Sequence, residues 1–145
     1  MPRSTTFLPD INVWVALASE RHIHNQAAAR WFDGIDDGQA AFCRITQMGL
    51  LRLLTNSRVM GGDMMIPSAA WRVYKALASD PRVRFAAEPP GLDQAWQSLT
   101  GNLATGQSRW TDTYLQAFAQ LREFSVVTFD RGFQQFHKPE AVVLS

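Results

Sequence analysis

Apolar residues occur along this chain in short blocks that alternate with longer stretches of helical spacing. The short blocks are rich in β-branched and aromatic residues, which is typical of buried strands. They predict strands at residues 5–8, 39–43, 82–86, 125–129 and 141–144. The longer stretches predict helices at 11–17, 25–32, 47–55, 67–79, 92–99 and 111–123, whereas 56–65 is predicted to be a loop. Strands that alternate with helices favour a parallel α/β sheet with helices on both faces.

Composition and length are consistent with one globular domain. The 145 residues are 46% hydrophobic and 19% charged, and no linker-like segment separates two cores, so we expect a single domain over residues 1–145. The formal net charge of +1 is not by itself the footprint of a nucleic-acid-binding surface. The single cysteine, Cys43, excludes an internal disulfide. Without a signal peptide or a run of about 20 apolar residues, we expect a cytoplasmic protein with no membrane segment.

Two of the predicted strands end at an aspartate. Asp10 follows the first strand directly, and Asp130 follows the strand at 125–129. Asp112 lies in the first turn of the helix that precedes this second strand, so the start of that helix lies near the same rim. Since parallel strands present their carboxyl ends at one edge of a sheet, we expect the three carboxylates to converge there. The alternative is that each aspartate only caps a helix, since helix N-termini favour acids.

Converged carboxylates repel one another, and a bound divalent cation removes that penalty. Ligand sets made of oxygen select Mg²⁺ or Mn²⁺ over zinc. A metal held by a few carboxylates activates water for phosphodiester hydrolysis. Asn12 and Thr128 lie beside the acids, and each can orient a carboxylate or a bound water.

Four arginines lie next to these segments and are candidates for contacts with a phosphate backbone: Arg44, Arg52, Arg109 and Arg131. The same residues can instead pair with the acids. Arg131 follows Asp130 directly, so it is the residue that we expect on the substrate side. Trp110 stands two residues before Asp112, where it can either stack on an RNA base or belong to the core.

Four segments in this order resemble the PIN-domain family, specifically the VapC-type toxins of bacterial toxin–antitoxin pairs. They are residues 8–13, 46–55, 112–119 and 128–133. The resemblance implies a three-layer α/β/α sandwich with a central parallel sheet of four to five strands. It also implies a ribonuclease that depends on Mg²⁺ or Mn²⁺, a cognate VapB-like antitoxin and a homodimer. Asp10, Asp112 and Asp130 match the acidic metal-binding residues of the family, and Thr128 matches a residue that supports the last acid.

One position departs from the family pattern. Relatives with a similar middle segment tend to carry Glu directly after the threonine that corresponds to Thr46, whereas this chain has Gln47. An amide oxygen can coordinate a cation or hold its water, but it brings no charge. We therefore expect weaker metal binding and a one-metal site. The alternative function is a PIN-like RNA- or protein-binding module with little or no nuclease activity.

A third possibility is a phosphoacceptor receiver domain, which is also a small doubly wound domain with clustered acids. That class resembles a pattern with two adjacent acids after the first strand and a lysine at the end of the last one. Here a single aspartate, Asp10, follows the first strand, and neither Lys75 nor Lys138 ends a predicted buried strand. The pattern favours the nuclease.

Overall fold

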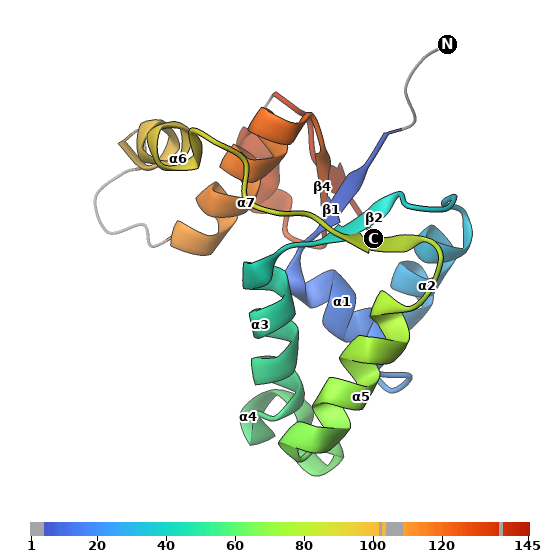
Figure 1. Ribbon diagram of the computed structural model, residues 1–145. Helices are drawn as coiled ribbons and strands as arrows, with labels where there is room; N and C mark the ends of the chain where they lie inside the picture. Colours follow the sequence, from blue (N-terminus) through green and yellow to red (C-terminus); the bar gives the residue numbers. More distant parts are fainter. Residues whose placement is uncertain (1–4, 102, 104–108, 137) are drawn as a thin grey trace.

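A parallel sheet of five strands runs through the centre of the computed structural model, which describes residues 5–101, 103, 109–136 and 138–145 (Figure 1). The strands are β1 (Phe7–Pro9), β2 (Ala40–Phe42), β3 (Val83–Phe85), β4 (Ser125–Thr128) and β5 (Val142–Val143). Their spatial order is β3-β2-β1-β4-β5, and every neighbouring pair is parallel. The first strand of the chain is therefore the central strand of the sheet, which confirms the predicted α/β class.

Helices cover both faces of this sheet. The longer ones are α1 (Ile11–Ala18), α2 (Asn25–Asp33), α3 (Arg44–Leu54), α5 (Pro67–Ala78), α6 (Leu92–Gly101) and α7 (Trp110–Arg122). The short ones are α4 (Ser57–Met60), η1 (Gly61–Asp63) and η2 (Arg131–Gln135). Figure 1 shows α6 and α7 on one side of the sheet and α1, α2, α3 and α5 on the other. Over the described residues, no helix has both the length and the apolarity that crossing a membrane would require.

Alternation along the strands explains why two layers of helices are needed. Leu8 and Val126 belong to the apolar cluster that α7 covers, whereas Phe42 belongs to the cluster on the opposite face. There the Trp14 ring of α1 stacks on Phe42, with ring centroids 3.8 Å apart. Since successive strand residues point to opposite faces, each strand contributes to two cores. The three-layer sandwich follows from this pattern.

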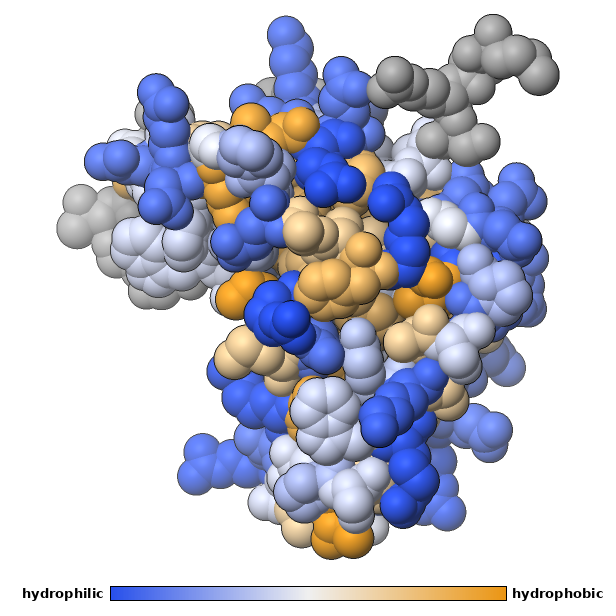
Figure 2. Space-filling model, in the orientation of Figure 1, coloured by the Kyte–Doolittle hydropathy of each residue, from blue (hydrophilic) through white to orange (hydrophobic). Residues whose placement is uncertain are grey.

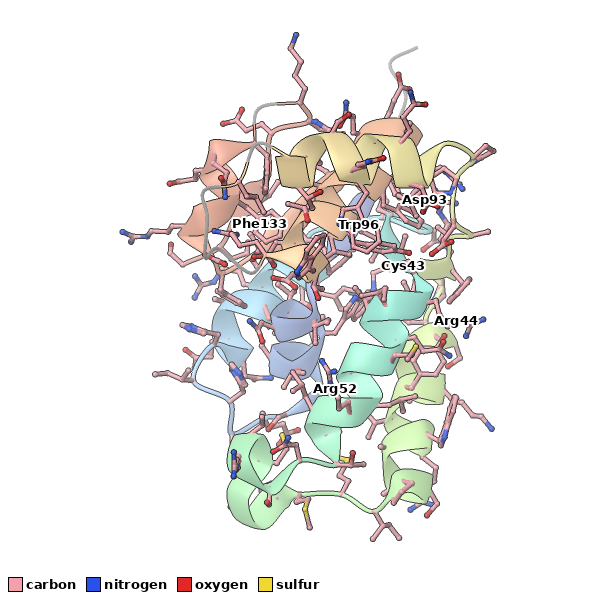
Figure 3. All side chains as sticks on the ribbon, turned by 90° about the vertical axis from the view of Figure 1, so that its left-hand side faces the viewer. Cys43, Arg44, Arg52, Asp93, Trp96 and Phe133 are labelled. Atoms are coloured by element: carbon pink, nitrogen blue, oxygen red, sulfur yellow. The ribbon has the colours of Figure 1, made fainter. Side chains whose placement is uncertain are left out.

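Two sequence-based predictions about the middle of the chain are wrong. The segment 56–65, expected to be a loop, contains α4 and η1, and the Asn56 side chain caps α4 through the amides of Arg58 and Val59. Helix α3 begins at Arg44 instead of after Thr46, because the Thr46 hydroxyl accepts a hydrogen bond from the Cys43 amide in a capping box. Figure 3 shows Cys43 and Arg44 at the start of α3, with Arg52 further along it.

The exposed edge of the sheet at β3 is shielded by arginines. Phe85 is 45% exposed, and the Arg44 guanidinium lies 5.0 Å from the centroid of its ring. The Arg84 guanidinium lies 5.2 Å from the ring of Phe124. Figure 2 shows apolar surface over this part of the molecule, flanked by hydrophilic side chains. Charged side chains along an edge strand discourage pairing with another chain.

Candidate active site at the carboxyl edge of the sheet

Asp10 lies at the end of the central strand and is only 6% exposed. Pro9, the last paired residue of β1, has no N–H to donate, and the amide of Asp10 donates to the Val127 carbonyl at 2.8 Å. One carboxylate oxygen of Asp10 accepts a hydrogen bond from the Ile11 amide at 2.7 Å and so caps α1. The other oxygen accepts from the Thr128 hydroxyl at 3.0 Å. Asp10 therefore caps its helix and also takes part in a network with the neighbouring strand.

The environment of Asp10 disfavours its charged form. Burial raises the pKa of its carboxyl group to about 6, and the hydrogen bond from Thr128 partly opposes this shift. The negative charges of Asp112 and Asp130 raise the pKa further. Among the described residues, both hydrogen-bond donors to this carboxylate are neutral groups, namely the Ile11 amide and the Thr128 hydroxyl. A cation at this position would offset the charge that burial penalises.

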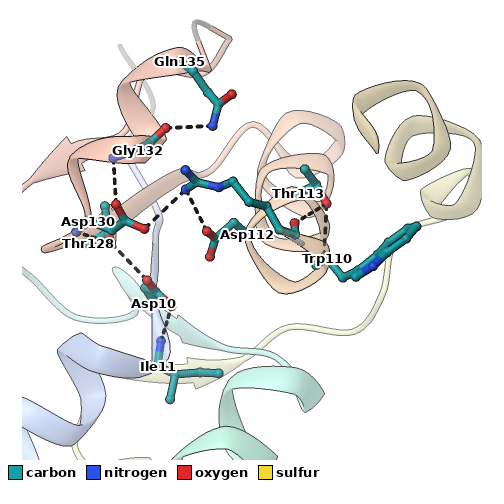
Figure 4. A network of polar contacts seen from close by, with 10 residues as sticks. Asp10, Ile11, Trp110, Asp112, Thr113, Thr128, Asp130, Gly132 and Gln135 are labelled. Atoms are coloured by element: carbon teal, nitrogen blue, oxygen red, sulfur yellow. Dashed lines mark hydrogen bonds and ion pairs between the residues drawn. The ribbon is translucent and has the colours of Figure 1, made fainter. Parts of the chain in front are cut away.

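Thr128 connects Asp10 to Asp130, as Figure 4 shows. This buried threonine ends β4, and its hydroxyl both donates to Asp10 and accepts a hydrogen bond from the Asp130 amide at 3.0 Å. One carboxylate oxygen of Asp130 accepts from the Gly132 amide at 2.7 Å at the start of η2. These hydrogen bonds fix two carboxylates from adjacent strands relative to each other.

Asp112 joins the same network through an arginine. Nη2 of Arg109 lies 2.7 Å from Oδ2 of Asp112 and 3.3 Å from Oδ2 of Asp130. Burial raises the pKa of Asp112, whereas the Arg109 charge lowers it. The start of α7, the end of β1 and the end of β4 thus bring the three predicted acids into one polar network.

The other predicted site residues lie at or near this edge in different environments. Gln47 is buried in α3, and its amide oxygen accepts a hydrogen bond from the Arg44 guanidinium. Asn12 is exposed in the first turn of α1, and Arg131 is exposed where η2 begins. Among the described residues, the arginine that pairs with the acids is Arg109. Its position three residues before Asp112, across one helical turn, is the sequence signal for this pair.

The donor atoms of the network suit a hard divalent cation. Carboxylate and hydroxyl oxygens are the ligands that Mg²⁺ and Mn²⁺ prefer, and the buried carboxylate of Asp10 receives hydrogen bonds from neutral donors only in the described part of the chain. Within that part, no three His, Cys, Asp or Glu side chains already surround a common point in a way that would hold an ion. The acids are instead joined by the Thr128 hydroxyl and the Arg109 guanidinium.

Comparisons with known proteins agree with the fold and the order of the motifs. The family model described as PIN domain matches residues 7–139. Ribonuclease VapC41 of Mycobacterium tuberculosis is 41% identical over 134 residues, which cover 89% of this chain and 92% of that protein. The crystal structure of M. tuberculosis VapC20, a sarcin–ricin loop cleaving toxin, matches with a TM-score of 0.69 and 16% identity over 97% of this chain and all of that one. A toxin–antitoxin complex from Klebsiella pneumoniae matches with a TM-score of 0.66 and 18% identity over 97% of both chains.

Proposed function

Because this chain belongs to the PIN-domain family, we propose that it is a divalent-metal-dependent endoribonuclease and the toxin of a VapBC-type toxin–antitoxin pair. The observation that carries this proposal is the polar network that links Asp10, Asp112 and Asp130 at the carboxyl edge of the sheet. Its relative VapC41 is a ribonuclease, and the fold neighbours include toxins and toxin–antitoxin complexes.

In this proposal Asp10, Asp112 and Asp130 hold one Mg²⁺ or Mn²⁺ ion. When bound, the ion would supply an activated water for attack on the phosphodiester and would offset charge in the transition state. The Thr128 hydroxyl orients the carboxylate of Asp10, and the Gly132 amide orients that of Asp130. Such hydrogen bonds keep ligand oxygens in place before substrate arrives. Asn12, Gln47 and Arg131 remain proposed supporting and substrate-binding residues at the rim.

The proposed partners are RNA, a VapB-like antitoxin and a second copy of the chain. Toxin–antitoxin complexes among the fold neighbours support the antitoxin. Large exposed apolar side chains near α4 and α5, including Met64, Ile66 and Trp71, provide surface that protein contacts can bury.

Metal dependence is the direct test of the proposed function. Purified protein incubated with RNA is expected to give endonucleolytic fragments in Mn²⁺ or Mg²⁺ and none in EDTA, because Asp10, Asp112 and Asp130 alone carry no activated water. Asp112→Asn protein, purified in the same way, is the control for contaminating nucleases and is expected to leave the RNA intact. Cleavage that survives both EDTA and Asp112→Asn would contradict the proposal. RNA binding without cleavage in any metal would favour the alternative of a binding module.

Trp110 gives the proposed RNA substrate an exposed aromatic surface at the start of α7. Its side chain is 62% exposed, and it directly follows Arg109, which contacts Asp112 and Asp130. The ring of Trp96 packs edge-to-face against it with centroids 6.1 Å apart, and Nε1 of Trp96 donates to the Trp110 carbonyl at 3.1 Å. Trp110 is thus held from one side while much of its ring remains accessible. An exposed ring at this place is suited to stacking on an unpaired base.

Trp110→Ala is expected to weaken the binding of a short single-stranded RNA by about tenfold to a hundredfold, because base stacking on an aromatic ring contributes about 1–3 kcal/mol. Trp110→Phe is expected to retain most of the affinity. Fluorescence anisotropy of labelled RNA in EDTA measures binding without cleavage. Trp71→Ala removes another exposed tryptophan, 44% exposed on α5, and serves as the matched control. Equal losses in the two alanine variants would rule out a specific stacking role for Trp110.

A further inference from the structure

Arg109 places a positive charge inside the network of acids. Its side chain is only 22% exposed, and the single nitrogen Nη2 contacts carboxylate oxygens of both Asp112 and Asp130. The guanidinium also lies 5.8 Å from the centroid of the Phe133 ring. This arginine therefore occupies the space between two of the three proposed metal ligands.

Gly132 provides the room that the guanidinium needs. A Cβ atom at this position would clash with Nη1 of Arg109 and would lie 2.7 Å from Nη2, which is far too close for atoms that are not bonded. The backbone of Gly132 does not have a positive φ angle, so the glycine is not required by the backbone conformation. What the missing side chain supplies is space for Arg109.

The same guanidinium is incompletely satisfied. Its Nε atom is buried, and within the described residues it has no hydrogen-bond partner. A buried donor without a partner costs free energy. This cost offsets part of the stabilisation that the guanidinium gains from its two contacts with carboxylates. A group held in this way can be exchanged for another cation more easily than a fully bonded one.

We propose that Arg109 is a displaceable counter-ion, whose guanidinium competes with the divalent cation for the carboxylates of Asp112 and Asp130. This inference rests on the proposed metal-dependent function. Like charges at close range repel, so a divalent cation and this guanidinium cannot both lie against the same two oxygens without a large penalty. In the metal-free protein Arg109 relieves the repulsion between the acids, and binding of the ion requires the guanidinium to turn away. The cost of that displacement lowers the affinity of the site for metal.

Mn²⁺ affinity, measured by isothermal titration calorimetry without RNA, tests the competition directly. Arg109→Gln is expected to bind Mn²⁺ about tenfold more tightly than the wild type, because the ion no longer displaces a charged group. Gly132→Ala is expected to tighten binding as well, although it keeps every charge, because the added methyl group displaces the guanidinium from the acids. Arg131→Gln removes the same charge directly beside Asp130 and is the control for a general electrostatic effect, with an expected change of less than about twofold.

Thermal unfolding gives a second readout of the same competition. In EDTA, Arg109→Gln is expected to melt at a lower temperature than the wild type, and saturating Mn²⁺ is expected to remove that difference. Unchanged or weaker Mn²⁺ binding in Arg109→Gln would overturn the inference, and so would an equal tightening in Arg131→Gln. If none of the four proteins bound Mn²⁺, the proposed function would fall together with this inference. If the wild type binds Mn²⁺ and Arg109→Gln binds it with the same affinity, the inference about Arg109 is overturned while the proposed function stands.

Discussion

Asp10→Asn is expected to abolish RNA cleavage and, at the same time, to stabilise the metal-free protein. The substitution removes a proposed metal ligand, so the cleavage rate should fall by about three orders of magnitude or more. The asparagine oxygen can still accept the hydrogen bond from the Ile11 amide, which keeps α1 capped. What the variant loses is a buried negative charge near Asp112 and Asp130.

The sign of the stability change follows from the pKa of Asp10. Folding raises this pKa from 3.8 to about 6, so the folded protein binds the proton more tightly than the unfolded chain. The free energy of unfolding of the metal-free wild type should therefore fall as the pH rises from about 4 to about 6, and it should not recover above that range. The total loss is on the order of 3 kcal/mol at 1.36 kcal/mol per pKa unit. In Asp10→Asn the contribution of Asp10 to this dependence on pH should be absent.

Urea unfolding in EDTA between about pH 4 and pH 7.5 measures the effect, and a cleavage assay in Mn²⁺ measures the loss of activity. Asp93→Asn removes an exposed acid at the start of α6 and is the matched control for the change in net charge. A variant that still cleaves RNA would show that Asp10 is not a ligand. If Asp10→Asn had a lower free energy of unfolding than the wild type at neutral pH, the charged form of Asp10 would not destabilise the folded protein, contrary to what its burial predicts.

Gln47→Glu combined with Arg44→Gln is expected to tighten Mn²⁺ binding by at least tenfold and up to about a hundredfold. Two unit charges 4 Å apart interact by about 4 kcal/mol near a protein surface, so an added carboxylate at the rim is a large perturbation. Gln47→Glu alone should have a much smaller effect, because the Arg44 guanidinium already contacts the side-chain oxygen at this position and would neutralise the new charge.

The comparison of the single and double variants makes this prediction specific. Arg44→Gln alone is the control for the loss of one positive charge near α3, and calorimetric titration with Mn²⁺ is the measurement. If the double variant binds Mn²⁺ no more tightly than Arg44→Gln, position 47 does not face the ion. If the double variant also cleaves RNA faster than Arg44→Gln, the neutral Gln47 limits the activity of the natural chain. The proposed nuclease and the alternative of a binding module with weak activity would then differ only in cleavage rate.

The arrangement of the acids follows from the sequence because it depends only on topology. Strands that are followed closely by Asp10 and Asp130, and a helix that begins near Asp112, must meet at one edge once the sheet is parallel. The short helices α4 and η1 escaped prediction because a four-residue helix has no apolar period, and its main signal is the single Asn56 cap. The start of α3 was misplaced because Thr46 acts from the third helical position of a capping box.

The contacts of Arg109 show why contacts of charged side chains are harder to predict than positions of strands. Adjacency in the chain makes Arg131 the candidate for the substrate side, and it is exposed at the start of η2. Arg109 reaches the acids because it precedes Asp112 by one helical turn and because Gly132, on another element, leaves space for it. The second condition depends on packing between distant segments, which the pattern of residues does not reveal.

The central place of β1 in the sheet also determines when during translation the proposed site can form. β1 is made first, but its neighbour β4 begins at Ser125, and the Thr128–Asp10 hydrogen bond joins positions 118 residues apart. A nascent polypeptide therefore contains Asp10 long before it contains Asp130. Ribosomes that stall or release their product earlier yield fragments without the complete set of acids. The network of acids can therefore form only after Asp130 has been synthesised.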